Sequence, residues 1–81
     1  MSDQELLLRI ESNAKVLAGK PTIRGTRLSV DFILGLLAHG LSFDEILGEY
    51  EGVTLYDIQA CLLFASQTLA STVFMPLPES A

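Results

Sequence analysis

The sequence predicts a mainly α-helical domain, in which three helices form a helix-turn-helix-like cluster behind a short strand-like or irregular head. Three observations predict this class. Hydroxyl-bearing cap residues precede three segments with apolar residues at helical spacing. Glycine follows the first two of these segments, as is usual where a helix ends. Prolines at positions 76 and 78 exclude a helix at the end of the chain. We therefore expect one domain over residues 1–72 and an extended apolar tail over residues 73–81.

The first ten residues fit two structures. Ser2 and Glu5 have the spacing of a capping box, which would open a short N-terminal helix. Leu6, Leu8 and Ile10 alternate with their neighbours as in a half-buried strand. Because the segment is short for a helix, we favour the strand.

Residues 19–27 read GKPTIRGTR and form a second part of the head. Pro21 disfavours helical angles at the residue before it, and the glycines on either side permit turns. We expect an ordered loop or a pair of very short strands here, with Ile23 and Leu28 as inward anchors.

The first predicted helix starts after the cap residue Ser29 and ends at Gly40. Its apolar residues recur at i, i+3, i+4 and i+7: Val30, Ile33, Leu34 and Leu37. A second capping box, Ser42 with Glu45, opens a shorter helix that ends before Gly52. One stripe of that helix is apolar: Phe43, Ile46, Leu47 and Tyr50.

Thr54 and Asp57 predict the start of the third and longest helix, which runs to about Ser71. Its expected inner face comprises Leu55, Ile58, Cys61, Leu62, Ala65 and Leu69. Further apolar residues cover much of the remaining circumference, namely Tyr56, Ala60, Leu63 and Phe64, and the tail adds Val73, Phe74, Met75 and Leu77.

A helix that is apolar nearly all round needs cover on nearly all sides, and two short helices with a loop are too small to provide it. We therefore predict that the four further apolar residues of the third helix and the four of the tail form a protein–protein interface, most simply that of a homodimer. The alternative is that the head of the same chain covers them.

Charge is divided unevenly along the 81 residues, whose net charge is −5. All five bases lie within the first 27 residues, whereas residues 28–81 contain seven acids and no base. This balance argues against nonspecific nucleic-acid binding by the whole surface. The third helix lacks the cations that dominate DNA affinity, so any DNA contact would use bases of the head: Lys15, Lys20, Arg24 and Arg27.

The chain has few residues of the types that catalysis and metal binding require. His39 and Cys61 are its sole imidazole and thiol, which excludes a conventional zinc cluster and an intrachain disulfide. His39 has the position of a helix C-terminal capping residue, and Cys61 that of a core residue. We expect no enzyme, no cofactor and no metal. The acidic start MSDQE and the short apolar runs predict a cytoplasmic protein without a membrane span.

A resemblance to a known family covers residues 19–65. It rests on the string GKP-x-I-x-GTR, the later G-L-S-x-x-E-I and a Y-x-G-(L/V)-T turn. These motifs resemble the small bacterial and archaeal family called domain of unknown function 433. Glu51 stands in the turn where that family commonly has proline. The matching residues are Gly19, Lys20, Pro21, Ile23, Gly25, Thr26, Arg27, Tyr50, Gly52 and Thr54.

The resemblance implies a homeodomain-like helix-turn-helix fold and an antitoxin role, because members are described as antitoxins of neighbouring PIN-like ribonuclease toxins. The acids of the second half fit that role, since a ribonuclease cleft must attract phosphates. They are Asp44, Glu45, Glu49, Glu51 and Asp57. A DNA-binding regulator of its own operon is the alternative.

The signature loop offers candidate contacts to a partner or to phosphate, through Lys20, Arg24, Gly25, Thr26 and Arg27. The loop is not a P-loop, because Thr26 follows Gly25 where that motif requires lysine. The alternative is structural, with the arginines tying the loop to nearby carbonyls or acids.

Overall fold

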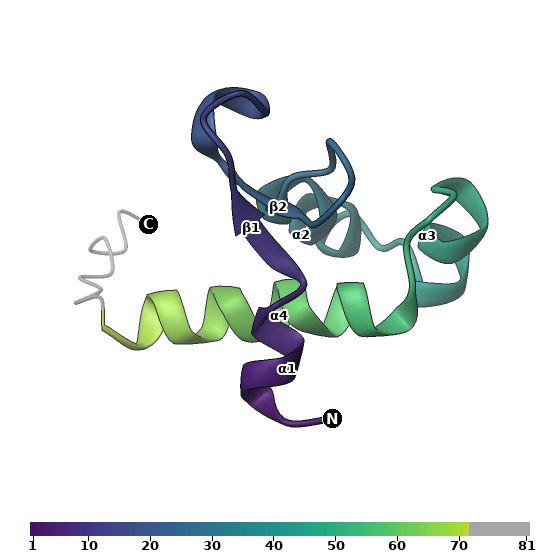
Figure 1. Ribbon diagram of the computed structural model, residues 1–81. Helices are drawn as coiled ribbons and strands as arrows, with labels where there is room; N and C mark the ends of the chain where they lie inside the picture. The colour runs from purple at the N-terminus through teal and green to yellow at the C-terminus, as the bar shows by residue number, and fades with distance from the viewer. Residues whose placement is uncertain (72–81) are drawn as a thin grey trace, which may run out of the picture.

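A computed structural model describes residues 1–71 and shows a mostly helical domain with a small antiparallel sheet (Figure 1). The long helix α4 is the central element: α1, α2, α3 and β1 all contact it. Within the described residues the elements are α1 (Asp3–Leu7), β1 (Ile10–Ser12), a 3-10 turn (Leu17–Gly19), β2 (Pro21–Ile23), α2 (Val30–Ala38), α3 (Phe43–Glu49) and α4 (Leu55–Ala70).

The N-terminal segment begins with a helix, so the strand predicted over residues 6–10 is wrong for most of its length. Both hydrogen bonds of the capping box form: Glu5 N donates to Ser2 Oγ at 3.1 Å, and Ser2 N donates to Glu5 Oε1 at 3.0 Å. The resulting helix half-buries Leu6 and Leu7 beside α4. Cover for the apolar α4 thus outweighs the alternating pattern, and of its residues Leu6, Leu8 and Ile10 only Ile10 lies in a strand, β1.

The head continues as a hairpin whose strands β1 and β2 pair antiparallel, with Ile10 opposite Ile23. One of the two very short strands expected in residues 19–27 is therefore present, and its partner lies earlier in the chain. Ile23 is buried as predicted, and Leu28 is half-buried against the core. An isolated bridge between Thr22 and Ser29 carries the extended pairing to the start of α2.

The three helices predicted after residue 29 are confirmed, and each begins at the predicted cap. Phe32 N donates to Ser29 Oγ, while Ser42 and Thr54 each complete a capping box with the acid three residues on. These side chains satisfy amides that have no partner inside the helix. Local hydrogen bonding therefore explains why all three starts were readable from the sequence.

The core lies where the hairpin and the four helices meet around α4. Every element from β2 onward contributes to it, and Val53 from the turn before α4 completes it. Its buried side chains are Ile23, Val30, Ile33, Ile46, Val53, Ile58 and Cys61.

The buried face of α4 is rotated from the predicted one. Ile58 and Cys61 are buried as expected, but Asp57 and Ala60 are buried with them. The head causes this rotation, because α1 and β1 cover a side of α4 that the prediction left open. Three residues assigned to the inner face are instead exposed: Leu55, Leu62 and Leu69.

Across the described part of the chain, no helix has the length and apolarity needed to cross a membrane. The predicted tail, residues 73–81, lies outside the described residues, and so do its four proposed interface residues, Val73, Phe74, Met75 and Leu77.

Candidate functional site

The signature loop is held in shape by its own threonine. Thr26 Oγ1 donates to the carbonyl of Ile23 at 2.7 Å and accepts from the amide of Leu28 at 3.0 Å. Gly25 has φ +79°, a conformation that residues with a side chain rarely adopt. Gly25 and Thr26 therefore shape the loop, and their contact with a partner or with phosphate stays a prediction.

Two cations of the loop already have partners within the chain. Lys20 Nζ lies 3.5 Å from Asp31 on α2. Arg24 donates through Nε to the carbonyl of Leu8 at 2.8 Å, and its guanidinium lies 3.7 Å from Glu11. Arg24 and Thr26 thus have the contacts that the structural alternative expects, and contact of the loop with a partner or phosphate stays a prediction.

Arg27 differs from the rest of the loop. Its side chain is exposed and forms no hydrogen bond or ion pair within residues 1–71. It shares an open hollow of about 360 Å³ with Lys20, whereas Arg24, Gly25 and Thr26 lie outside that hollow. The other lining residues are Leu17, Leu28, Ser29 and Phe32. Of the five loop candidates, the structure therefore brings together only Lys20 and Arg27.

An ion pair that the sequence did not reveal joins the head to α4. Arg9 Nη1 lies 3.1 Å from Asp57 Oδ1, and the guanidinium carbon lies 5.4 Å from the ring centroid of Tyr56. Asp57 Oδ2 accepts from the amide and the hydroxyl of Thr54, at 2.9 and 3.1 Å. Asp57 is consequently buried and fully engaged, so its assignment to an acidic docking face is wrong. The one signal was Arg9 itself, a lone charge inside an apolar run.

The acidic face is made by α3 and the turn that follows it. Its four carboxylates are exposed, and none of them forms an ion pair within the described chain: Asp44, Glu45, Glu49 and Glu51. Glu45 also accepts from the amide of Ser42, which lowers the pKa of this carboxyl below its ordinary value. Glu45 is therefore ionised at neutral pH.

The predicted interface on α4 is partly corrected by the structure. Ala60 is fully buried, so it is not available to a partner; the head occupies the surface assigned to it. Tyr56 is exposed, while Leu63 and Phe64 are half-buried. The sequence prediction missed Leu55, Leu62 and Leu69, which lie on the outer side of the helix.

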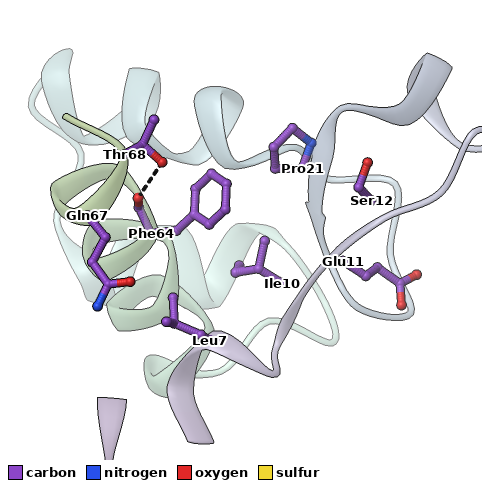
Figure 2. A pocket seen from close by; sticks show the side chains of 8 residues that line it. All are labelled: Leu7, Ile10, Glu11, Ser12, Pro21, Phe64, Gln67 and Thr68. Carbon is purple, nitrogen blue, oxygen red and sulfur yellow. Dashed lines mark hydrogen bonds between the residues drawn. The ribbon is translucent and has the colours of Figure 1, made fainter. Parts of the chain in front are cut away.

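Phe64 separates two apolar hollows near the end of α4. In Figure 2 its ring projects from α4 toward the hairpin, where Ile10 and Pro21 lie. That hollow holds about 380 Å³ and is also lined by Leu7, Glu11, Ser12, Gln67 and Thr68. A second hollow of about 290 Å³ lies between Phe64 and α2. Neither gathers the convergent polar groups that a small-molecule site usually has.

Cys61 and His39 have structural positions. The side chain of Cys61 is buried, and burial, with a smaller contribution from Asp57, raises the pKa of its thiol to about 12. A thiol of that pKa is protonated at neutral pH and is a poor nucleophile. His39 Nδ1 lies 2.7 Å from the carbonyl of Gly35, as expected of a C-terminal capping residue. In the part of the chain that is described, no three His, Cys, Asp or Glu side chains are grouped to hold a metal.

Comparison with known proteins gives the chain a family. Residues 10–65 match the family described as protein of unknown function, DUF433. The chain belongs to this family. The match confirms the resemblance found in residues 19–65, and it adds the strand β1 to the region shared with other DUF433 proteins.

A solved DUF433 structure has the same fold. The crystal structure of a DUF433 member protein from Anabaena variabilis ATCC 29413 superposes with a TM-score of 0.73 at 28% sequence identity. The alignment covers 83% of this chain and 66% of that one, so this chain spans just under two thirds of its relative's length. No curated protein matches the chain.

Proposed function

We propose that this DUF433 protein is an antitoxin-type binding protein that neutralises a PIN-like ribonuclease by direct contact through its acidic face. The observation that carries the proposal is the set of four exposed carboxylates on α3 and the following turn, none of them paired with a base in residues 1–71. Within the chain, the described bases that form ion pairs do so with other acids.

The chemistry of a ribonuclease explains why such a face suits it. An enzyme that cleaves RNA must bind phosphates, so its cleft presents positive charge. The carboxylates on α3 can bind in this positively charged cleft in place of phosphates. The positive potential of the cleft also steers them toward it before contact. Because residues 28–81 contain no base, nothing nearby in the sequence cancels this attraction.

An aromatic pair beside the acidic face supplies an apolar contact for the same partner. The ring of Phe32 on α2 meets the ring of Tyr50 edge to face, with centroids 5.6 Å apart and planes at 88°. Tyr50 is the C-cap of α3, so this pair adjoins the acidic helix. Exposed aromatic side chains next to charges are frequent anchors of protein interfaces.

A DNA-binding regulator is the competing expectation, and the observations support it less. Arg9, Lys20 and Arg24 are paired with acids of the same chain, and α4 contains no base. Contacts between cationic side chains and phosphate dominate DNA affinity. A surface on which only Lys15 and Arg27 are free of ion pairs within residues 1–71 is therefore poorly suited to DNA. The homeodomain-like arrangement of α2, α3 and α4 stays a prediction, as does the cytoplasmic location that an antitoxin role requires.

Copurification with charge variants tests the proposal. The chain is co-expressed with the proposed partner, a PIN-like ribonuclease of the same genome, and the complex is isolated. Glu49→Gln/Glu51→Gln removes two charges from the acidic face, and neither residue is a helix N-terminal cap. We expect affinity for the nuclease to fall about tenfold or more.

The matched control is Asp3→Asn/Glu5→Gln, which removes two charges from α1 and keeps a glutamine able to complete the capping box. We expect this control to bind like the wild type. Failure of the nuclease to copurify with the unmodified chain would refute the proposal. Equal weakening in both variants would refute the assignment of the contact to the acidic face.

A further inference from the structure

A row of exposed leucines runs along the outer side of α4. Leu55, Leu62 and Leu69 are 42%, 41% and 66% exposed, and they follow one another at intervals of seven residues. Seven residues are nearly two turns, so the three side chains lie about 10 Å apart on one side of the helix. An ordinary surface helix has polar or charged residues on this side.

The whole outer face of α4 lacks charge. The helix has one charged residue, Asp57, and that residue is buried against Arg9. The other exposed residues of this side are neutral, among them Tyr56, Gln59 and Ser66. In a chain with net charge −5, a four-turn helix with an uncharged, leucine-bearing exposed face is unusual for a surface that faces only water. Such a face indicates contact with another protein.

We propose that a second copy of this chain covers this face, with the two α4 helices packed antiparallel about a two-fold axis at Leu62. In such a pair, Leu62 meets the same residue of the other copy. Leu55 then meets Leu69, because both lie seven residues from the axis on opposite sides. A symmetric interface requires a self-complementary surface, and this spacing provides one. Heptad spacing also suits helices that cross at a shallow angle.

The absence of charge on this face permits a second copy, and the charge elsewhere selects its direction. Two copies that each carry −5 repel each other through most of their surfaces, but at the neutral face of α4 they can meet without placing like charges against each other. The acidic helix α3 adjoins the N-terminal end of α4 (Figure 1). Antiparallel packing therefore places the two acidic faces at opposite ends of the dimer, whereas parallel packing would place them side by side.

This dimer is independent of the proposed function, since it uses α4 and leaves the acidic face of α3 open. The test measures the mass of the full chain in solution by sedimentation at tens of micromolar, for the wild type and for Leu62→Lys. We expect a wild-type dimer and a monomeric Leu62→Lys variant, because the two introduced lysines would meet at the axis. Leu8→Lys, the same change at a more exposed leucine outside α4, is the control and remains dimeric.

Cysteine cross-linking tests the direction and does not depend on how well the lysine variant folds. Under mild oxidation Leu62→Cys forms a covalent dimer, and a mixture of Leu55→Cys with Leu69→Cys forms the mixed dimer. Leu55→Cys alone does not, whereas parallel helices would cross-link it. A monomeric wild type, or a Leu62→Lys dimer as stable as that of Leu8→Lys, would overturn the proposal. Cross-linking of Leu55→Cys alone would overturn the antiparallel arrangement.

Discussion

Arg9 and Asp57 lie 48 residues apart in the chain, and their side chains meet at 3.1 Å, which fastens the head of the domain to the first turn of α4. The same carboxylate caps the helix through Thr54, so one side chain joins local and long-range structure. This contact lies on the buried side of α4, with Ile58 and Cys61, and away from the outer row of leucines.

Arg9→Ala leaves the Asp57 carboxylate buried without its counter-charge. We expect the free energy of unfolding to fall by about 2 kcal/mol, less than for a completely buried pair because Arg9 keeps about a third of its exposure. Urea denaturation measures this loss. Lys20→Ala, which breaks an exposed pair with Asp31, is the control and should cost less than about 1 kcal/mol. Equal losses would show that the Arg9 pair has no special role.

Thr26→Val keeps the shape of the side chain and removes the hydroxyl that closes the signature loop. Two hydrogen bonds are lost, so we expect a destabilisation of about 1–3 kcal/mol. Thr26→Ser retains the hydroxyl and should recover most of the stability. Thermal unfolding followed by circular dichroism distinguishes the two variants. A Thr26→Val protein as stable as the wild type would show that the threonine is not needed for the fold.

Alkaline pH should destabilise the protein through Cys61. The pKa of this thiol rises from 9.0 to about 12 in the folded state, mainly through burial. Above pH 9 the unfolded chain loses the proton that the folded chain keeps, so stability falls as pH rises. The expected loss by pH 11 is about 2–3 kcal/mol, at roughly 1.4 kcal/mol per pH unit. Urea denaturation between pH 8 and pH 11 measures it, and Cys61→Ala should show a shallower decline than the wild type.

Substitutions on opposite sides of α4 test the observed orientation of the helix. Ala60→Leu inserts a large side chain at a fully buried position, and we expect it to cost about 1–3 kcal/mol. Ala70→Leu makes the same change at an exposed position of the same helix and should cost less than about 0.5 kcal/mol. Chemical denaturation at low protein concentration compares the two. Similar costs would contradict the burial of Ala60.

Sequence reasoning succeeded where a few neighbouring residues determine the structure. The caps at Ser29, Ser42 and Thr54 each bond to the amide three residues ahead, so the starts of α2, α3 and α4 could be predicted. The short helix α1 and the rotation of α4 depend on each other and on contacts across the chain. Alternating leucines carry no record of such contacts, and the lone Arg9 in an apolar run indicates a partner without identifying it.

The candidate site divides in the same way. The acidic stretch around α3 was visible from composition, because nothing in the sequence neutralises it. Asp57 does not belong to this acidic face, because it is paired with Arg9. The sequence pattern of a capping aspartate is the same with or without such a distant arginine. The four residues of α4 that were predicted to form the interface included Ala60, which is buried. They omitted the three exposed leucines of the same helix.

The most direct test of the proposed function is the cleavage of RNA by the proposed partner, a PIN-like ribonuclease of the same genome, titrated with this chain. The proposal predicts that activity falls to zero at a fixed stoichiometry, and that added salt weakens the inhibition because the contact depends on charge. Undiminished cleavage at a large excess of the chain would contradict it.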